Sequence, residues 1–388
     1  MTNQITRFSF PTQIIFGAGA IGELPGEFAA LGVKKPLVVT DGAMVKTAAF
    51  ASILEVIKKA GVPFEVFSAV QPNPHDGDVE KGVQSYKSTG CDFIIGVGGG
   101  SPMDAAKALA VLVGLGGSVE EYDAQSPTAT PIKGPLPPIV MIPTTAGTGS
   151  EVGKCAVITS TAQGRKIFLC NPAMMPARAI LDPELTVSLP AHLTAATGMD
   201  ALTHNIESFT APIFHPMCDA IALKGIELAA NNLARAVEHP ADLKARGNMM
   251  LSAMMGAVAF QKDLGTAHSL SHALSAVCGL QHGQANAMVL PHVMDFNKDV
   301  CPGEYARIAR EFDIPVHTMG DAEAAEKLIE KIRELNTRIG IPAALSRAGV
   351  KESQIPEIAA KAFKDPCHLT NIKGCTQEDL TALLQKAL

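Results

Sequence analysis

The first half of the chain alternates short runs of β-branched residues with stretches of helical periodicity. Four runs predict strands, over residues 36–40, 64–67, 92–97 and 139–142, and the segment 102–113 is apolar at helical spacing. Strands separated by helix-length connections are typical of a parallel sheet with helices on both faces. The pattern therefore predicts an α/β N-terminal domain with a parallel sheet.

The character of the sequence changes after about Asp182. Valine, isoleucine and threonine become rarer, while alanine, leucine, methionine and lysine dominate long periodic stretches. These stretches predict helices over residues 219–236, 241–260, 322–339 and 377–388. We expect two domains, an α/β domain over residues 1–185 and an all-α domain over residues 186–388, because 388 residues exceed one ordinary core.

Composition narrows the possible partners. Hydrophobic residues make up 47% and charged residues 18%, which favours a large buried core over disorder. The net charge is −6 and the basic residues are scattered, which argues against nucleic acid or an anionic membrane as a partner. The start of the chain lacks a leader-like apolar run, and the longest apolar segment, 105–113, is about half of a membrane span. We therefore expect a cytoplasmic protein with a small-molecule substrate.

The cysteines predict no disulfide framework. None of the eight forms a C-x-x-C pair or another metal-type pattern. In a chain of this length we expect them to be mostly buried, reduced and packed as small apolar residues.

Two glycine-rich segments are candidates for binding a phosphate-containing cofactor. The first runs Gly98-Gly99-Gly100-Ser101-Pro102-Met103-Asp104 after a predicted strand, where glycines allow close approach and Ser101 is expected to cap the following helix. The second runs Pro143-Thr144-Thr145-Ala146-Gly147-Thr148-Gly149-Ser150-Glu151 after another strand. A tight structural turn is the alternative for each, but ligands bind at the carboxyl ends of parallel strands, so two such loops favour a cofactor site.

Asp41 ends a predicted strand and bears on the choice of nucleotide. A carboxylate there can accept hydrogen bonds from an adenosine ribose and would repel a 2′-phosphate, which favours NAD over NADP. Capping of the next helix is an equally good interpretation of the same residue.

Five potential metal ligands gather in three short segments of the second half. Asp200 and His204 stand four residues apart, His268 and His272 repeat that spacing, and His282 follows. On a helix this spacing places both side chains on one face. A lone buried histidine is more often a hydrogen-bonded core residue, but two such pairs favour a site for Zn²⁺ or Fe²⁺. Spacing alone does not tell which of the five is not a ligand.

Together these segments resemble the iron-containing, group III alcohol dehydrogenase family over nearly the whole chain. The resemblance includes Phe16-Gly17-Ala18-Gly19 and the ranges 98–107, 143–151, 198–207 and 267–291. It implies a Rossmann-like parallel sheet followed by a helical domain, as in the dehydroquinate synthase-like architecture, and by analogy a homodimer.

The resemblance also implies roles for individual residues. It assigns the metal to Asp200, His204, His268 and His282, and it makes His272 the unliganded histidine beside substrate and nicotinamide, in the proton path. It implies NAD contacts from Asp41, Asn73, Gly98, Gly99, Gly100, Ser101, Thr144, Thr145, Thr148 and Lys166, with Asp104 in the same segment. The implied reaction is hydride transfer between a small primary alcohol and NAD, with the metal as Lewis acid.

Several stretches are similar to the 4-hydroxybutyrate dehydrogenase branch of this family, among them Phe214-His215-Pro216 and Phe260-Gln261-Lys262. An ω-hydroxy acid would need a cation near the metal, for which Lys154 and Lys262 are candidates; a surface or cofactor-side position is the alternative for both. Two other functions stay open at this point: a metal- and NAD-dependent synthase of the dehydroquinate synthase type, and a non-catalytic ligand-binding protein.

Overall fold

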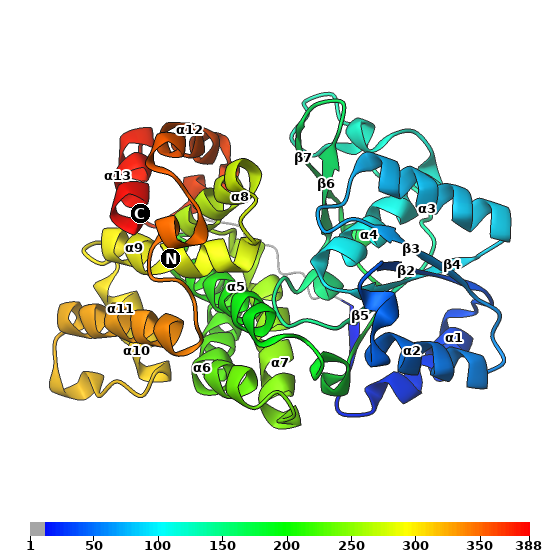
Figure 1. Ribbon diagram of the computed structural model, residues 1–388, viewed down its shortest axis with the longest axis horizontal. Coiled ribbons are helices and arrows are strands. Elements are labelled where there is room, and N and C mark those ends of the chain that lie inside the picture. Colours follow the sequence, from blue (N-terminus) through cyan, green and yellow to red (C-terminus); the bar gives the residue numbers. More distant parts are fainter. Residues whose placement is uncertain (1–11) are drawn as a thin grey trace. The chain divides into compact units, whose positions relative to one another are not determined.

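The computed structural model describes residues 12–388, and these divide into two compact units. One, the N-terminal domain, comprises residues 12–145 and 149–189. The other, the helical domain, comprises residues 146–148 and 190–388. Figure 1 shows strands only in the first and helices throughout the second.

The N-terminal domain is built on a six-stranded parallel sheet in the order β1-β8-β5-β4-β2-β3 (Figure 1). The strands are β1 (Gln13–Phe16), β2 (Pro36–Asp41), β3 (Glu65–Val70), β4 (Phe93–Gly98), β5 (Ile139–Pro143) and β8 (Arg178–Leu181). The four strands predicted from β-branched runs are confirmed. Strands β1 and β8 were not predicted, because four residues each are too few for a clear pattern.

Helices cover both faces of this sheet, as expected for a parallel sheet. Alternate residues of one strand enter different cores: Val38 packs on the side of α1 (Leu24–Leu31) and α2 (Ala48–Lys59), whereas Leu37 and Val39 pack on the other side. That other side holds α3 (Asp76–Thr89) and α4 (Gly100–Leu115). Because α4 carries buried residues all round, it lies inside the domain rather than on its surface.

An antiparallel hairpin, β6 (Cys155–Ser160) with β7 (Arg165–Cys170), packs against α4. Cys155 and Cys170 are directly opposite in the hairpin and form a disulfide, an exception to the expectation that the cysteines are mostly reduced. The other six are free, and half of them are buried while the rest are partly exposed. The pairing depends on the register of the hairpin, which cysteine spacing does not reveal.

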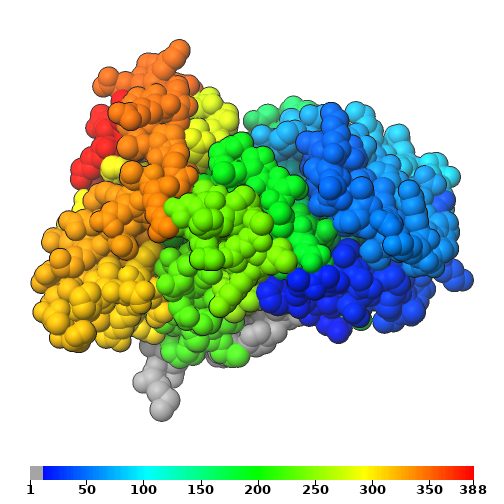
Figure 2. All heavy atoms as spheres, turned by 60° about the horizontal axis from the view of Figure 1, so that its bottom comes forward, coloured from blue at the N-terminus to red at the C-terminus, as the bar shows by residue number. Residues whose placement is uncertain are grey.

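The helical domain contains nine α-helices among the described residues. They are α5 (Ala191–Thr210), α6 (Pro216–Glu238), α7 (Leu243–Ala259), α8 (Thr266–Cys278), α9 (His282–Asn297), α10 (Pro302–Glu311), α11 (Asp321–Arg338), α12 (Ile355–Lys364) and α13 (Gln377–Ala387). All four predicted helices are confirmed and correspond to α6, α7, α11 and α13, with ends that agree to within three residues. Helix α5 is buried over residues 198–210 and packs against α6, α7 and α9. Helices α10 and α11 lie at the surface of the face shown in Figure 2. In the part of the chain described here, no helix is both long and apolar enough to cross a membrane.

Candidate metal centre and cofactor loops

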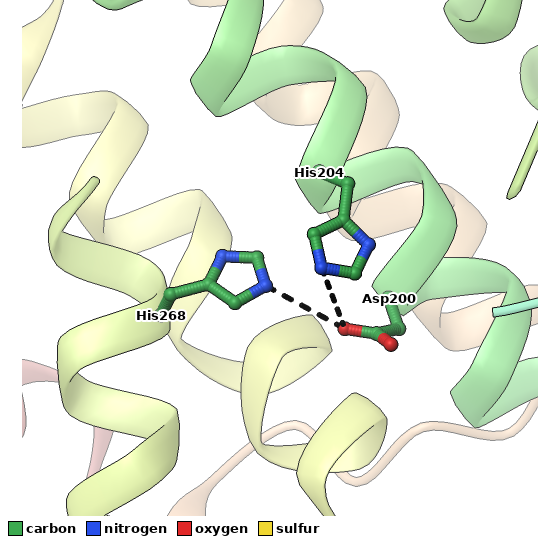
Figure 3. Close-up of side chains that lie close together, drawn as sticks. All are labelled: Asp200, His204 and His268. Atoms are coloured by element: carbon green, nitrogen blue, oxygen red, sulfur yellow. Dashed lines mark ion pairs between the residues drawn. The ribbon is translucent and has the colours of Figure 1, made fainter. Parts of the chain in front are cut away.

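Three helices of the helical domain bring the predicted metal ligands together. Asp200 and His204 lie one turn apart on α5, His268 lies in the first turn of α8, and His282 begins α9. Figure 3 shows the carboxylate of Asp200 directed toward the rings of His204 and His268. The i, i+4 spacing thus places both α5 side chains on the buried face that meets α8.

The donor atoms converge on one carboxylate oxygen. Oδ1 of Asp200 lies 4.0 Å from Nε2 of His204, 3.7 Å from Nε2 of His268 and 3.3 Å from Nε2 of His282. Four donors held about 2.1 Å from one tetrahedral ion would be about 3.4 Å apart. Ligand atoms of Asp200, His204 and His268 lie within 4.8 Å of one another, and His282 adjoins this group through Asp200. The chemistry of these donors fits Fe²⁺ or Zn²⁺.

Hydrogen bonds behind the imidazoles aim their Nε2 atoms inward. Nδ1 of His268 lies 2.6 Å from Oε2 of Glu207, a carboxylate that can only accept, so Nδ1 carries a proton and, in the neutral ring, the lone pair is on Nε2. Ser271 donates to the backbone oxygen of His282 at 2.9 Å and lies 2.8 Å from its Nδ1, which therefore donates to the hydroxyl. Such partners fix the tautomer and orientation of metal-binding histidines.

A buried asparagine on α9 joins these ligands. Nδ2 of Asn286 lies 2.8 Å from Oδ1 of Asp200, 3.2 Å from Nε2 of His268 and 3.3 Å from Nε2 of His282. Asn286 lies one turn after His282 and is fully buried. It holds the carboxylate in the position from which it meets the imidazoles.

The sequence analysis did not single out Glu207, Ser271 or Asn286. A signal for Glu207 was present, because positions 200, 204 and 207 follow one face of a helix at i, i+4 and i+7. For Ser271 and Asn286 we find no comparable signal, since serine and asparagine are common on helices for other reasons.

The pKa shifts in the cluster favour an ionised carboxylate at Asp200 and neutral imidazoles at His204 and His282. Burial alone would raise the pKa of Asp200, but the neighbouring His204 and His282 and hydrogen bonds from His268 and His282 lower it well below its usual value. Burial lowers the pKa of His204 to about 3 and also lowers that of His282. For His268, burial is outweighed by hydrogen bonds to Asp200 and Glu207, which raise its pKa to about 9. An ionised carboxylate and neutral imidazoles are the forms that bind metal, so His268, which its two carboxylate neighbours hold protonated, has to release a proton when a metal binds.

His272 differs from the other histidines in its partner. Its Nδ1 lies 2.8 Å from Oδ2 of Asp365, and its ring stacks on that of His282 at a centroid distance of 5.1 Å. Asp365 also accepts from the hydroxyl of Ser269 and the amide of Cys367. Burial would raise the pKa of Asp365, but the hydrogen bond with His272 lowers it, so Asp365 is a carboxylate that orients this ring. The side chain of His272 is one-third exposed, more than that of His268 at 1%.

In the N-terminal domain, the two glycine-rich segments lie next to each other. The amide of Thr144 donates to the carbonyl of Gly98 at 2.9 Å, and a Cβ on Gly99 would lie 3.5 Å from Thr145. Gly98 has a φ of +134°, and a Cβ there would lie 2.6 Å from Pro102. Only glycine fits such a position, which keeps the backbone accessible where β4 meets α4.

One part of the prediction for the first segment is wrong. Helix α4 begins at Gly100 with Gly99 as its N-cap, and no side chain caps it. The hydroxyl of Ser101 instead donates to the carbonyl of Pro72 at 2.5 Å, because Ser101 is already inside the first turn. Pro102 lies in that first turn, where the missing amide hydrogen of proline costs no helical hydrogen bond.

Asp41 caps a turn and also lies beside the glycine-rich segment. Its Oδ1 accepts hydrogen bonds from the amides of Ala43 and Met44 at 2.8 and 2.9 Å, so it caps the short turn that follows β2. Its Oδ2 lies 3.7 Å from the Cβ position of Gly98, beside the glycine-rich segment. The cap uses one oxygen and leaves the other near the candidate cofactor loop.

The remaining candidates are more widely placed. Nζ of Lys166 on β7 donates to Oδ1 of the exposed Asn73 at 3.1 Å, which brings these two predicted contacts together. Both oxygens of Asp104 accept hydrogen bonds from the protein, from Ser150 at 2.7 Å and from the amide of Val157 at 3.0 Å. Thr148 belongs to the helical domain by its contacts.

The two lysines considered for a substrate carboxylate have different environments. Lys154 is exposed in the N-terminal domain. Lys262 is 3% exposed, and its Nζ donates to Oδ1 of Asp219 at 2.5 Å and to the carbonyl of Phe209 at 3.1 Å. It is therefore not a surface residue, and its charge is already balanced.

Comparison with known proteins identifies the family. Residues 11–183 match the model of the iron-containing alcohol dehydrogenases, and residues 194–388 match that of the C-terminal region of the Fe-containing alcohol dehydrogenase family. The chain is 37% identical over 385 residues to the NAD-dependent methanol dehydrogenase of Bacillus methanolicus, covering 99% of this chain and 100% of that one. It is also 37% identical over 386 residues to the 4-hydroxybutyrate dehydrogenase of Cupriavidus necator, covering 97% and 98%. A solved 1,3-propanediol oxidoreductase superposes with a TM-score of 0.95 at 35% identity, covering 99% of this chain and 100% of that one. The chain therefore belongs to the iron-containing alcohol dehydrogenase family.

Proposed function

We propose that this protein is a metal-dependent, NAD-linked oxidoreductase that interconverts a small primary alcohol and its aldehyde. The observation that carries the proposal is the convergence of three Nε2 atoms on Oδ1 of Asp200, with partners that aim two of these nitrogens inward. The family match favours this function over the synthase and the non-catalytic alternatives.

Each side chain has a distinct part in this proposal. Asp200, His204, His268 and His282 would hold the metal, and the glycine-rich segments with Asp41 and Lys166 would bind NAD. A divalent metal would polarise the alcohol or aldehyde oxygen, and NAD would accept or supply the hydride. Asp365 holds the proton of His272 on Nδ1, so Nε2 of His272 is free to accept the proton that alcohol oxidation releases.

The lining of the metal centre favours a small substrate without charge. The ring of Phe260 lies 5.5 Å from that of His204, between centroids. Lys262 is already paired with Asp219 and so is a poor partner for a carboxylate. These contacts support a neutral alcohol or diol as the first candidate.

An ω-hydroxy acid such as 4-hydroxybutyrate is the second candidate. It is favoured by the 37% identity with a 4-hydroxybutyrate dehydrogenase over nearly the full length of both chains. The relatives also include a 1,3-propanediol dehydrogenase and a lactaldehyde reductase at 36% and 35% identity, so identity alone does not choose.

The test is NADH-linked turnover of methanol, longer primary alcohols, diols and 4-hydroxybutyrate, with metal analysis of the same sample. We expect a chelator to abolish turnover and added Fe²⁺ or Zn²⁺ to restore it. Full activity in a metal-free sample would refute the proposal. A kcat/KM for 4-hydroxybutyrate well above those of the neutral alcohols would make the second candidate the substrate.

A further inference from the structure

A buried charged network in the N-terminal domain has no part in the chemistry proposed above. Its centre is Lys107, which lies on α4 and is fully buried. Asp104 lies almost one turn earlier on the same helix, and the short turn Ser150–Val152 supplies Ser150 and the buried Glu151. A buried ammonium group is costly unless it is paired and hydrogen-bonded.

Every polar atom of Lys107 and Asp104 has a protein partner. Nζ of Lys107 donates to Oγ of Ser150 at 2.8 Å and to the carbonyl of Cys155 at 2.9 Å. The hydroxyl of Ser150 donates a hydrogen bond to Oδ1 of Asp104 at 2.7 Å, and Oδ2 of Asp104 accepts from the amide of Val157 at 3.0 Å. Ser150 thus bridges the two charges, and the network connects α4 to both the turn and β6.

The segment that carries Ser150 is also attached to the start of α4, through residues 144–145. Thr144 donates its amide to Gly98 at 2.9 Å, and Thr145 lies against Gly99. The chain that leaves β5 is therefore held at residues 144–145 by the glycine-rich segment and at residue 150 by Lys107 and Asp104. A loop whose two ends are fixed loses less conformational entropy when a ligand orders it.

The energetics favour a role in geometry over one in stability. Burial lowers the pKa of Lys107 to about 8 and raises that of Glu151 to about 7, so burial disfavours the charged form of both groups. A buried ion pair is often no more stabilising than an apolar pair of similar volume. Directional hydrogen bonds from a fixed ammonium do, however, determine where the hydroxyl of Ser150 lies.

We propose that Asp104, Lys107 and Ser150 form a clamp that fixes residues 143–145 and 149–153 in the conformation that binds the nicotinamide cofactor. The three are positioning residues, and Asp104 acts through the clamp rather than by touching NAD, because both its oxygens are already engaged. The inference rests on the proposed role of the two glycine-rich segments in binding NAD.

The test compares NAD affinity in the metal-loaded variants Lys107→Met and Ser150→Ala. Each should raise the Kd for NAD by at least about tenfold, the effect of losing one charge-assisted buried hydrogen bond, while the metal content stays at the wild-type level. Calorimetric titration with NAD measures the first and elemental analysis the second. Ser150→Ala removes the bridge without leaving a lone buried charge, so it decides the matter if Lys107→Met does not fold.

Two further variants separate the possible causes. Asp123→Asn also removes a buried charge from this domain, where Asp123 pairs with Arg165, but it does not touch the clamp. It should lower Tm and leave NAD affinity unchanged; a loss of affinity equal to that of Lys107→Met would mean general destabilisation and overturn the clamp. Wild-type NAD affinity in both clamp variants would overturn it as well.

Thr145→Val tests the underlying cofactor site independently. If Thr145→Val weakens NAD binding and the clamp variants do not, the cofactor site stands and the clamp is wrong. If the metal-loaded wild type binds no NAD, the proposed function itself fails.

Discussion

Glu207 and His268 share a 2.6 Å hydrogen bond between Oε2 and Nδ1, although 61 positions separate them in the chain. The other oxygen, Oε1, accepts from the amide of Ala267 at 2.6 Å, and Oε2 also accepts from Gly265 at 3.0 Å. One carboxylate on α5 thus caps the start of α8 and orients the imidazole that α8 contributes. Position and tautomer of His268 are set by the same side chain.

We expect Glu207→Gln to weaken metal binding by about 10- to 100-fold, the usual effect of removing a partner behind a ligand histidine. The amide can still accept from the backbone of α8 but no longer supplies the negative charge beside His268. Chelator competition measures the affinity. Glu227→Gln, which removes an exposed carboxylate paired with Lys224, is the control. Equal affinity in the two variants would show that Glu207 does not support the metal centre.

His268→Ala and His272→Ala should have different consequences. His268 lies 3.7 Å from the carboxylate of Asp200, so its loss should leave the protein without metal. His272 is bonded to Asp365, so His272→Ala should keep the metal while kcat falls by about 10²- to 10⁴-fold, as for loss of a general base. Metal content and turnover are measured on the same samples. Equal metal loss in both would mean that the fourth imidazole ligand is misassigned.

Asp41→Asn should relax the preference for NAD over NADP. The asparagine keeps an Oδ1 that can cap Ala43 and Met44, but it removes the negative charge that would repel a 2′-phosphate. We expect the KM for NADP to fall by roughly tenfold, because the substitution removes one charge repulsion. The Tm should not change. An unaltered ratio of kcat/KM for the two cofactors would mean that Asp41 acts only as a cap.

The stability of the protein should depend on pH through Glu151. Burial raises the pKa of this carboxyl from 4.5 to about 7. Between these values the folded protein keeps a proton that the unfolded chain has released, so the contribution of Glu151 to stability falls as pH rises through this window. The side chain introduced by Glu151→Gln does not titrate, so the Tm of this variant should rise relative to that of the wild type between pH 5 and pH 7.5. A constant difference in Tm across this range would show that Glu151 ionises normally.

Local sequence determined most of the secondary structure. The β-branched runs 36–40 and 92–97 became β2 and β4, and the periodic stretch 322–339 became α11, because side-chain period and propensity act within a few residues. The spacing of Asp200 and His204 likewise placed both on one face of α5. The same local rules failed for Ser101, where a shift of two residues in the start of α4 moved the cap to Gly99.

Contacts between distant segments were decided only by the tertiary structure. Spacing left five candidate ligands, and only the packing of α5, α8 and α9 brought His204, His268 and His282 to Asp200 and turned His272 to Asp365. The partners Glu207 and Asn286, the Cys155–Cys170 disulfide and the clamp around Lys107 depend on the same kind of long-range packing. Helices and strands form through interactions between residues that are neighbours along the chain. The geometry of a site depends instead on the packing of elements that are far apart in the chain and that exclude water where they meet.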